Sequence, residues 1–492
     1  MSARWNENRK IARRILIRGR LTLITPARFG GGEDGPVTDM PILRDAQTRQ
    51  PLLPGSSIAG AMRAYLRERL QGYEESEPDN VTLLSQKLFG DVLEKVPENQ
   101  RASLESYLTI EDALAENAFT ELRPGVKIDP ATRIAAFEED KGGQLFNMEL
   151  LEPGTHFDLN MELDLPEDEE LQNELLEGLA IALSGFEKGE IGLGARKRRG
   201  FGECKVDEWK VQTYNLKKPA ELVDWIEGKP GKAGNGATVS DKLGVKHPLR
   251  DRRKYFRMEA EFKLSTSLLI RSGTGQNDSP DMVHLRSGHG DNTKSILSGT
   301  SLAGAMRARG LKIANTLFGD QDKAKTFVME IFGPDKLERQ EERRDQDAPF
   351  ASRLLVRERE VQGRTDLVQS RIRIDRFTGG TFPGALFDQQ PLVGGDGSRI
   401  LISIELRNPE DAQIGLLLHI LKDLWVGDLA LGGESSAGRG RLAGVKADLS
   451  LHLPGQEKPE VWQITPQPDG RLLINGEQSR LNDYAVCVGG AK

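Results

Sequence analysis

Alternating apolar and polar residues predict strands at matched places in the two halves of the chain. Near the start, Ile15 and Ile17 alternate with arginines, as in a strand that buries one face. The same alternation returns in three later segments, and apolar residues at helical spacing fill two others. We therefore expect strands at residues 10–24, 155–164, 256–270 and 400–406, and helices at residues 169–187 and 410–426.

A nine-residue motif occurs twice and marks the two halves as copies of one another. It reads GSSIAGAMR from Gly55 to Arg63 and GTSLAGAMR from Gly299 to Arg307. The offset is 299 − 55 = 244 residues. Self-similarity of this kind at a fixed offset is the signature of a duplicated domain.

Each copy of the motif predicts the start of a helix, at about residues 57–71 in the first half. Ser56 or Ser57, and Thr300 or Ser301, are the residue types that cap helix N-termini. The small residues at 60, 61, 304 and 305 would let each helix approach another backbone. The free N–H groups of such a helix start favour an anion such as an RNA phosphate. A capped core helix without a ligand is the plain alternative.

Two other features of the motif bear on phosphate binding. No Gly-Lys-[Ser/Thr] sequence follows the glycines, which excludes a Walker-type phosphate loop. Arg63 and Arg307 lie one to two helical turns beyond the expected cap. They are expected to reach a phosphate or, alternatively, to form surface salt bridges.

The order of elements predicts the fold class. Each half reads strand, helix, strands, helix, strand, which suits a ferredoxin-like sheet. We expect an α+β protein of two tandem ferredoxin-like domains, with inserted hairpins and helical insertions. The first domain is expected at residues 1–211, a Pro-, Lys- and Gly-rich linker at 212–252, the second domain at 253–447, and an extension without counterpart at 448–492.

Composition limits the class of protein. The chain has 492 residues and a net charge of −7, which argues against a generic nucleic-acid coat. Its only cysteines are Cys204 and Cys487, so a disulfide framework is excluded and a reducing, cytoplasmic setting is expected. No apolar run is long enough to span a bilayer, and we expect no membrane partner.

Basic residues are concentrated in a few runs, so a positive groove is possible despite the acidic total. One run is Arg196-Lys197-Arg198-Arg199 within a glycine-rich loop, and a second glycine-rich loop carries Arg439 and Arg441. Arg371 and Arg373 lie on a segment, 371–387, that predicts a hairpin, as does segment 123–146. Such runs are often only solvated faces.

The motifs taken together resemble the RAMP superfamily. The resemblance rests on a glycine-rich loop after the first strand, on Asp39-Met40-Pro41-Ile42-Leu43-Arg44-Asp45, on Pro54 to Arg63, on Leu88-Phe89-Gly90 and on Gly200-Phe201-Gly202. It covers about residues 10–211 and 253–445. Within the superfamily the chain is similar to the repeating backbone subunit of type III CRISPR effector complexes, and a fused pair is similar to the double subunit of the III-D variant.

The resemblance implies binding of a CRISPR guide RNA and of a complementary target RNA, beside other RAMP and effector subunits. We expect Arg196, Lys197, Arg198, Arg199, Arg439 and Arg441 to contact the RNA backbone, because arginine can bind phosphate through two hydrogen bonds and the flanking glycines let the chain approach. The other RNA-binding candidates are Arg371, Arg373 and the motif residues Ser56, Ser57, Arg63, Thr300, Ser301 and Arg307. The resemblance also implies a thumb-like hairpin that displaces a nucleotide. Ile134, Phe137, Phe377 and Phe382 would wedge against bases or, equally, pack the hairpin.

The resemblance further implies that an aspartate in each copy supports cutting of the target RNA with Mg²⁺ or another divalent metal. Asp39 holds that position in the first copy, and Asp281 aligns with it in the second. The second copy lacks the proline of Asp-x-Pro and has Ser287 in place of Asp45. A solvated aspartate has a pKa of about 4, so metal binding or orientation is favoured over a role as general base. A loop-shaping aspartate is the alternative.

Two further functions stay open at this stage. The chain could be a non-catalytic RNA-binding scaffold, or a guide-processing ribonuclease of the same superfamily. His284 and His289 lie near Asp281 and are acid–base candidates, although His284 occupies a strand-like position that also suits a packed side chain. The first copy has no histidine in the matching loop, which counts against guide processing.

Overall fold

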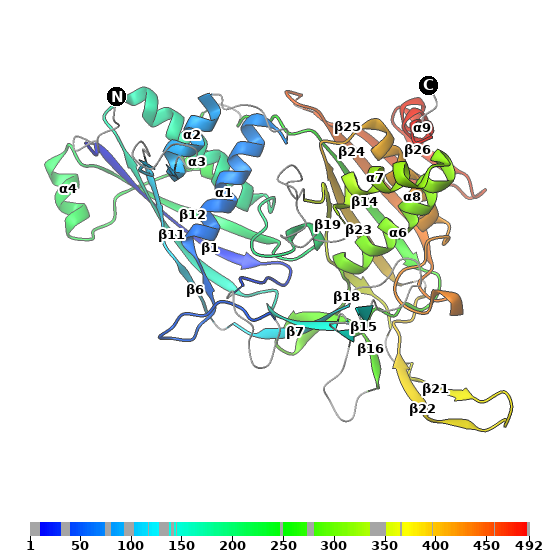
Figure 1. Cartoon of the computed structure of the whole chain (residues 1–492). Coiled ribbons are helices and arrows are strands. Elements are labelled where there is room, and N and C mark those ends of the chain that lie inside the picture. Colours follow the sequence, from blue (N-terminus) through cyan, green and yellow to red (C-terminus); the bar gives the residue numbers. More distant parts are fainter. Residues whose placement is uncertain are drawn as a thin grey trace.

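Two domains of the same architecture lie side by side in the computed structural model (Figure 1). The structure describes residues 10–30, 40–73, 80–92, 103–116, 118–126, 137–138, 142–143, 145–246, 249–272, 280–334, 351–364, 367–395, 397–456 and 458–489. None of the helices in these ranges has the length and apolar character needed to cross a membrane.

The sheet of the first domain has the ferredoxin-like order. β1 pairs antiparallel with both β11 and β12, and the path through the sheet is β13-β12-β1-β11-β6-β2, with β5 also on β11. The strands are β1 (Arg13–Leu23), β2 (Leu52–Leu53), β5 (Leu108–Ile110), β6 (Ala113–Glu116), β11 (His156–Leu165), β12 (Cys204–Asn215) and β13 (Lys232–Ala233).

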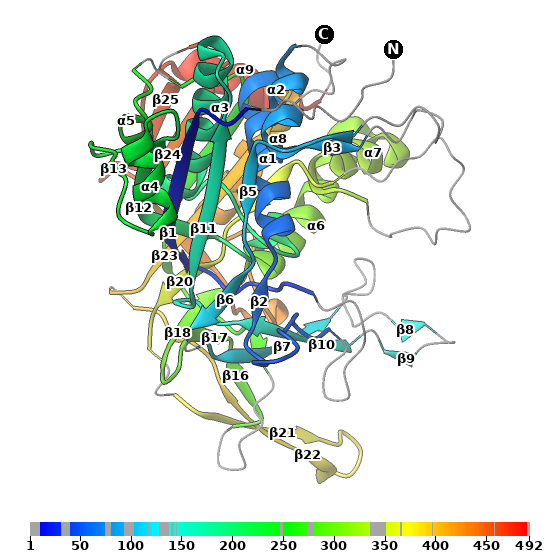
Figure 2. The ribbon, with the colours of Figure 1, turned by 90° about the vertical axis from the view of Figure 1, so that its left-hand side faces the viewer.

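Three helices cover one face of this sheet (Figure 2). They are α1 (Gly55–Gln71), α2 (Asn80–Phe89) and α3 (Glu169–Glu187). Strand residues such as Ile15, Ile17 and Leu21 are buried beneath them, whereas Arg18 and Arg20 on the other face are exposed. The alternation along β1 therefore follows directly from which face the helices cover.

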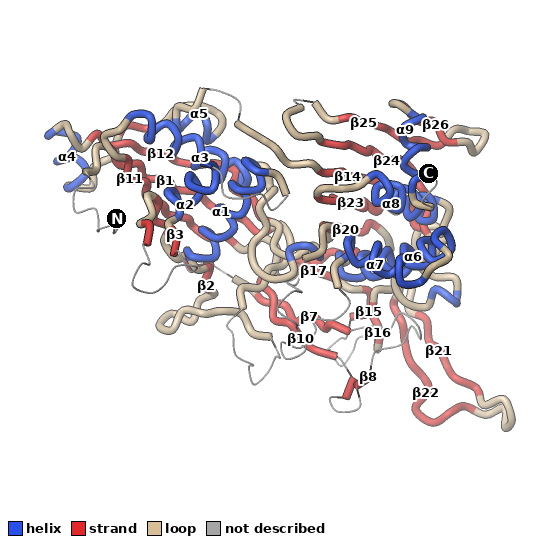
Figure 3. Tube along the Cα trace, turned by 45° about the horizontal axis from the view of Figure 1, so that its top comes forward, coloured by secondary structure: helices blue, strands red, loops and turns tan. Residues whose placement is uncertain are grey.

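The second domain repeats this arrangement (Figure 3). Its sheet runs β17-β18-β20-β23-β14-β24-β25-β26, with β19 also on β23. The strands are β14 (Tyr255–Leu264), β17 (Arg286–His289), β18 (Asn292–Leu297), β19 (Leu354–Val356), β20 (Arg359–Gln362), β23 (Arg399–Arg407), β24 (Leu442–His452), β25 (Glu460–Pro466) and β26 (Leu472–Asn475). The helices are α6 (Gly299–Phe318), α7 (Gln321–Phe332) and α8 (Asp411–Trp425).

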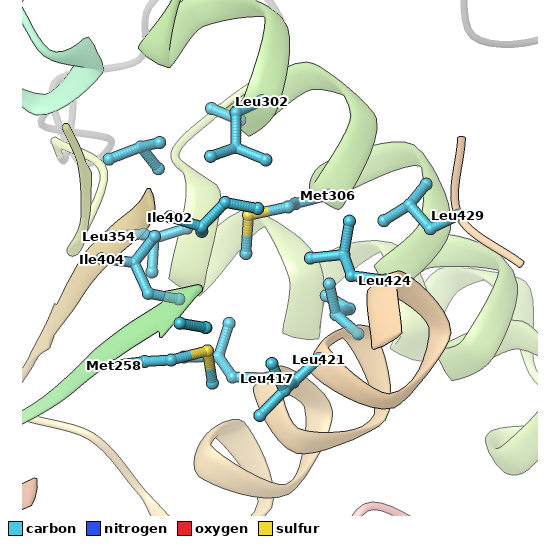
Figure 4. Close-up of a cluster of buried hydrophobic side chains, with 14 of the residues drawn as sticks. Met258, Leu302, Met306, Leu354, Ile402, Ile404, Leu417, Leu421, Leu424 and Leu429 are labelled. Atoms are coloured by element: carbon cyan, nitrogen blue, oxygen red, sulfur yellow. The ribbon is translucent and has the colours of Figure 1, made fainter. Parts of the chain in front are cut away.

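The core of the second domain lies between its sheet and its helices (Figure 4). Met306 of α6 and Leu417 and Leu421 of α8 pack against Met258 and Ile404 of the sheet. All five side chains are buried. Burial stabilises this contact by about 1.5–3 kcal/mol for each large apolar side chain. The contact orients α6 and thereby fixes where its N-terminus lies.

A hairpin is inserted in each domain, between β6 and β11 in the first domain and between β20 and β23 in the second. In the first domain, β7 (Thr120–Val126) pairs with β10 (Leu145–Leu151), and the shorter β8 (Phe137–Glu138) and β9 (Gly142–Gly143) lie between them in sequence. In the second domain, β21 (Gln369–Ile374) pairs with β22 (Thr381–Gln390) and projects away from the body (Figure 1). Shorter pairs are β3 (Asp91–Val92) with β4 (Ser103–Leu104), and β15 (Arg271–Ser272) with β16 (Met282–His284).

The α+β fold class, the ferredoxin-like order and the two helices expected at 169–187 and 410–426 are confirmed. The expected linker, however, is largely folded onto the first domain. It continues β12 and then forms α4 (Pro219–Ile226), β13 and α5 (Val239–Leu243). β13 extends the sheet beside β12, and α5 buries Val239 and Leu243.

The C-terminal extension has a counterpart after all, in that folded linker. β25 extends the second sheet beside β24, as β13 does beside β12. α9 (Gln478–Cys487) packs on α8, where the backbone of Tyr484 touches the position that a Cβ on Gly415 would occupy. The sequences of the two segments do not match, so the repeat of an added strand and a later helix was hidden.

The two domains meet along a seam of ion pairs. Arg123 of β7 donates to Glu358 of the second domain (Nη1 to Oε2, 2.6 Å), and both residues are 4 % exposed. Glu203 accepts from Arg357 (2.5 Å) and Arg359 (2.8 Å). Glu68 of α1 pairs with Arg407 of β23 at 2.5 Å. Charged groups this deeply buried are tolerated because each has a partner.

Two glycines allow the backbones to approach across the seam. A Cβ on Gly200 would lie 2.5 Å from the backbone nitrogen of Glu358, and a Cβ on Gly299 would collide with the carbonyl oxygen of Arg199. Gly200 also has a φ of 90°, which favours glycine. The close contact at the seam therefore requires residues without a side chain at positions 200 and 299, as well as the ion pairs.

We expect Arg123→Ala to weaken the coupling between the domains by about 3–5 kcal/mol, because Glu358 would be left buried and unpaired. The loss should be smaller at pH 5, since burial raises the pKa of Glu358 and a protonated carboxyl needs no cationic partner. Calorimetric unfolding measures this as a lower and less cooperative transition. The control is Arg399→Ala, which removes an exposed pair with Glu261 and should cost less than about 1 kcal/mol. Equal effects of both substitutions would contradict the seam as described.

Candidate nucleic-acid interface

The starts of the two motif helices are capped differently from the expectation. α1 begins at Gly55, whose backbone nitrogen donates to Asp112 (2.7 Å), and its N-cap Pro54 has no side-chain bond. α6 is capped by Ser298, whose hydroxyl accepts from the nitrogen of Ser301 (3.3 Å). The expected caps Ser56, Ser57, Thr300 and Ser301 are therefore wrong, because residues outside the motif run do the capping.

The first turns of these helices are open to solvent instead. Ser56 and Ser57 are exposed, and Thr300 and Ser301 are partly exposed. A Cβ on Gly60 or Gly304 would meet nothing within 4 Å, so the expected close backbone approach at these glycines is wrong. Gly55 and Gly299 make the close approaches instead, to the carbonyls of Ile110 and Arg199.

The motif arginines lie inside the fold rather than on this open turn. Arg63 donates to the carbonyls of Phe89 (2.8 Å) and Gly90 (2.5 Å) at the end of α2. Arg307 is partly buried near Arg199. Burial lowers the pKa of Arg199, and the charge of Arg307 lowers it further. Arg63 thus holds α2 on α1, which leaves the hydroxyls and glycine as the accessible part of the motif.

The basic loop at 196–199 is divided between the surface and the seam. Arg196 and Lys197 are exposed, and the Arg196 guanidinium lies 4.9 Å from the centroid of the Phe146 ring. Arg199 donates to the carbonyl of Phe332 in the other domain (2.7 Å). Arg198 lines a cavity of the seam beside Arg407, and the pKa of Arg198 is lowered to about 10 by burial and then by that neighbour. Arg196 and Lys197 have the more accessible side chains, and Lys197 also lines this cavity.

The matching loop of the second domain carries no basic run. The 3-10 turns Lys197–Arg199 and Ser435–Ala437 occupy the same place, and each follows a residue with left-handed φ, Arg196 or Glu434. Arg439 is buried and donates to Glu434 (2.8 Å) and Gln369 (2.6 Å). Arg441 is exposed. Of the two arginines expected to contact RNA here, only Arg441 has an accessible side chain.

The second hairpin presents apolar side chains to solvent. Phe377 near its tip is 99 % exposed, and Ile374 and Leu386 are also exposed. Arg371 at the base pairs with Glu434 (3.0 Å), while the Arg373 guanidinium lies 4.6 Å from the centroid of the Phe382 ring. In the first hairpin, Ile134 and the side chain of Phe137 lie outside the described residues.

The candidate catalytic aspartate of the second copy lies at the base of that hairpin. Asp281 is exposed, and its Oδ2 accepts from the backbone nitrogen of Asp388 on β22 (2.9 Å). The next residue, Met282, pairs in parallel with Gln389 of the same strand. Asp39 lies outside the described residues, but Met40 after it makes the matching parallel bridge, to Met148 of β10.

Asp388 and Glu434 are candidate site residues that the sequence alone did not suggest. Asp388 lies beside Asp281, and one of its carboxylate oxygens is buried without a hydrogen-bond partner among the described residues. Glu434 joins Arg371, Arg439 and Gln389 in one network. Only the register of β22 against β16 brings Asp388 to Asp281, and no motif marks that register.

The carboxylates at this base suit a hard divalent cation. The described residues hold no group of three or more His, Cys, Asp or Glu side chains placed to bind a metal. Asp281 and Asp388 are nevertheless neighbours, and carboxylate oxygens are the ligands that Mg²⁺ prefers. Mg²⁺ keeps several waters and shares substrate phosphates, so two protein ligands are compatible with it.

The histidines do not take part in this site. His284 is buried, with Nε2 3.0 Å from the carbonyl of Ile296 and Nδ1 accepting from the nitrogen of Ile270. Burial lowers its pKa to about 4. His289 packs edge-on against Phe119 of the first domain. His284 is therefore a packed side chain, which was the alternative to an acid–base role.

Comparison with known proteins places the chain in a family. A sequence model of the RAMP superfamily matches residues 20–205 and again residues 261–443. The CRISPR system Cms endoribonuclease Csm3 of Mycobacterium tuberculosis is 27% identical over 217 residues, 40% of this chain and 89% of that protein. The protein of the same name from Methanocaldococcus jannaschii is 26% identical over 240 residues, 44% of this chain and 92% of that protein.

Each of these relatives is matched by less than half of this chain, in keeping with two copies here. The two matched segments coincide with the two ferredoxin-like domains. The chain belongs to the RAMP superfamily and carries two RAMP domains.

Proposed function

We propose that the chain is a guide-RNA-binding backbone subunit of a type III CRISPR effector complex, of the fused double-domain kind of the III-D variant. It cuts complementary target RNA at two positions, one for each domain. Its partners are the guide RNA, the target RNA and other RAMP and effector subunits, in the cytoplasm. Support comes from the two RAMP domains and from relatives whose names describe CRISPR endoribonucleases.

One observation carries the proposal of two cutting sites. In both domains the residue after the candidate aspartate pairs in parallel with the second strand of the inserted hairpin, Met40 with Met148 and Met282 with Gln389. The duplication has thus kept one backbone arrangement at two hairpin bases. A target strand that passes both bases meets the same geometry twice.

The accessible cations and helix starts suit the guide backbone. The open first turns of α1 and α6 present hydroxyls, which can bind phosphate oxygens. Arg196, Lys197 and Arg441 add exposed positive charge in the two glycine loops. Contacts of this kind position nucleic acid without reading its sequence, as a subunit that accepts any guide requires.

The second hairpin suits insertion between bases. A two-stranded hairpin with Phe377 and Leu386 exposed is not stabilised by its own core. Aromatic side chains stack on bases with about 1–3 kcal/mol for each base. Phe377 would therefore stack in the guide–target duplex and displace the nucleotide next to it.

The chemistry follows from the displaced nucleotide. Displacement aligns its 2′-hydroxyl with the adjacent phosphorus for in-line attack, and the 5′-oxygen of the next nucleotide leaves. Asp281 would orient the hydroxyl or hold a divalent metal with Asp388. The metal would supply stabilisation of the charge that develops on the phosphoryl oxygens. In the first domain Asn147 occupies the position of Asp388, and its amide oxygen would serve the same end.

We expect Asp281→Asn to abolish one of the two cuts, with a loss of at least about 100-fold in its rate. Asparagine keeps the hydrogen bond from the nitrogen of Asp388 and removes only the charge, so the fold is retained. Asp39→Asn should abolish the other cut. The assay is target-RNA cleavage by the assembled complex, with the products mapped to single nucleotides.

Asp469→Asn is the matched control, because this exposed aspartate lies in the same domain, in the turn between β25 and β26. It should leave both cuts intact. If Asp39→Asn and Asp281→Asn also leave both cuts intact while the target is bound, the chain is an RNA-binding scaffold and the catalytic proposal is wrong.

We expect Phe377→Ala to slow the cut that depends on Asp281 by about tenfold, since the loss of one base stack is worth about 1–3 kcal/mol. The cut that depends on Asp39 should be unchanged. Leu317→Ala, a change of an exposed residue on α6, is the control. Equal slowing of both cuts by Phe377→Ala would show that the hairpin does not act on a single site.

A further inference from the structure

A cavity of about 120 Å³ lies at the seam between the two domains. In the first domain its walls come from α1, from the loop after α3 and from the glycine loop that ends at Glu203. In the second domain they come from β19, β23 and the residue Arg357. Any ligand in this cavity would therefore contact both domains at once.

The carboxylates that line this cavity already have cationic partners. Two further cations, Lys197 and Arg198, line it as well, and neither forms an ion pair with a described residue. The lining therefore carries two cations that its own carboxylates do not pair. The existing pairs are Glu68 with Arg407 (2.5 Å), Glu190 with Arg253 (2.8 Å), and Glu203 with Arg357 (2.5 Å) and Arg359 (2.8 Å).

Arg198 has a donor that points to a missing acceptor. Its Nη1 is buried and has no hydrogen-bond partner among the described residues. Burial, and then the charge of Arg407, lower the pKa of Arg198 to about 10. A pKa this far above 7 leaves the guanidinium charged at neutral pH. A buried charged donor without an acceptor is costly, and native proteins rarely keep one unless an ion, a water or a function accounts for it.

A second unpaired donor comes from the other domain. Arg407 lines the same cavity, and its Nε is buried without a hydrogen-bond partner in the described part of the chain. Glu405 Oε1 lies 3.7 Å from this nitrogen, which is too far for a hydrogen bond. The Tyr73 ring centroid lies 4.8 Å from the Arg407 guanidinium carbon, and the Tyr73 hydroxyl is a third buried donor without a described partner. Unpaired donors from both domains thus gather at one place.

The local fold does not explain the cation at position 198. The 3-10 turns Lys197–Arg199 and Ser435–Ala437 occupy the same place in the two domains. Ser436 therefore stands in the second domain where Arg198 stands in the first. The same backbone turn forms with a small neutral side chain, so its geometry does not require an arginine.

The size and the chemistry of the cavity limit the class of ligand. The space has room for at least about four waters, whereas pockets for drug-sized molecules measure about 300 Å³ or more. Guanidinium groups bind the oxygens of phosphate and carboxylate strongly. A tetrahedral oxyanion presents acceptor oxygens in several directions, which suits donors that approach from two sides of the seam.

We propose that this cavity binds one free oxyanion of the size of inorganic phosphate, held between Arg198 of the first domain and Arg407 of the second. The anion accepts hydrogen bonds from both guanidinium groups and neutralises the charge that the glutamates leave unpaired. Because it contacts both domains, it stabilises their docked arrangement by mass action. This binding is separate from the cutting of RNA.

Isothermal titration calorimetry of the purified full chain with inorganic phosphate, at constant ionic strength in chloride, tests the proposal. The wild-type chain should bind one phosphate with a dissociation constant of about 1 mM or lower, and phosphate should raise its unfolding temperature until the site is saturated. Arg198→Gln should weaken phosphate binding at least about tenfold, because it removes a charged donor. Without phosphate, Arg198→Gln should unfold at the wild-type temperature or above, since it removes a buried charge that has no partner.

Lys458→Gln is the control, because it makes the same change in net charge at an exposed residue between β24 and β25. It should bind phosphate as the wild type does. A wild-type chain that shows no saturable binding would overturn the proposal. Equal binding by wild type and Arg198→Gln would also overturn it, since it would indicate an adventitious ion only.

A second titration distinguishes a free anion from a phosphate group of RNA. Phosphate should bind equally well when the chain already holds single-stranded RNA. If the RNA blocks phosphate binding, the cavity receives an RNA phosphate and the proposal of a free anion is wrong. None of these results depends on RNA cleavage, so they are independent of the proposed cutting sites.

Discussion

The buried pair between Arg123 and Glu358 is the interaction on which the relation between the two domains depends. Such a pair adds little net stability compared with apolar packing, but a single broken partner is costly. Its main effect is therefore on geometry, because only one arrangement of the domains satisfies both charges. Arg123 lies on β7, the first strand of the inserted hairpin, so the same contact fixes the first hairpin relative to the second domain.

The two copies keep one backbone and differ in the charges around it. At the hairpin base, Asp388 and Glu434 of the second copy stand where the first copy has Asn147 and Arg196. The basic run Lys197–Arg199 is replaced by Ser435–Ala437. Part of the run in the first copy serves the seam, through Arg199, which donates to the carbonyl of Phe332 in the second domain.

Sequence reasoning recovered the features that depend on local periodicity and on the repeat. The strands near 155–164 and 400–406, the helices at 169–187 and 410–426 and the hairpin at 371–387 follow from patterns within about twenty residues, whereas the strand expected at 256–270 ends at Leu264. The caps at Asp112 and Ser298 and the pairing of Asp388 with Asp281 were missed, because they depend on contacts between distant segments or on the register of two strands. Arg63, Arg199 and Arg439 were expected to contact RNA, and the structure instead bonds them to the protein's own carbonyls and side chains.

We propose that the seam, and not the chain connection, sets the separation of the two candidate cutting sites. The direct measurement is the number of nucleotides between the two cuts on one target RNA after a flexible Gly-Ser segment is inserted between Lys246 and Leu249. The spacing and its sharpness should stay as in the wild type, because the ion pairs at Glu358, Glu203 and Glu68 still hold the domains together. A spacing that becomes longer or variable would contradict it.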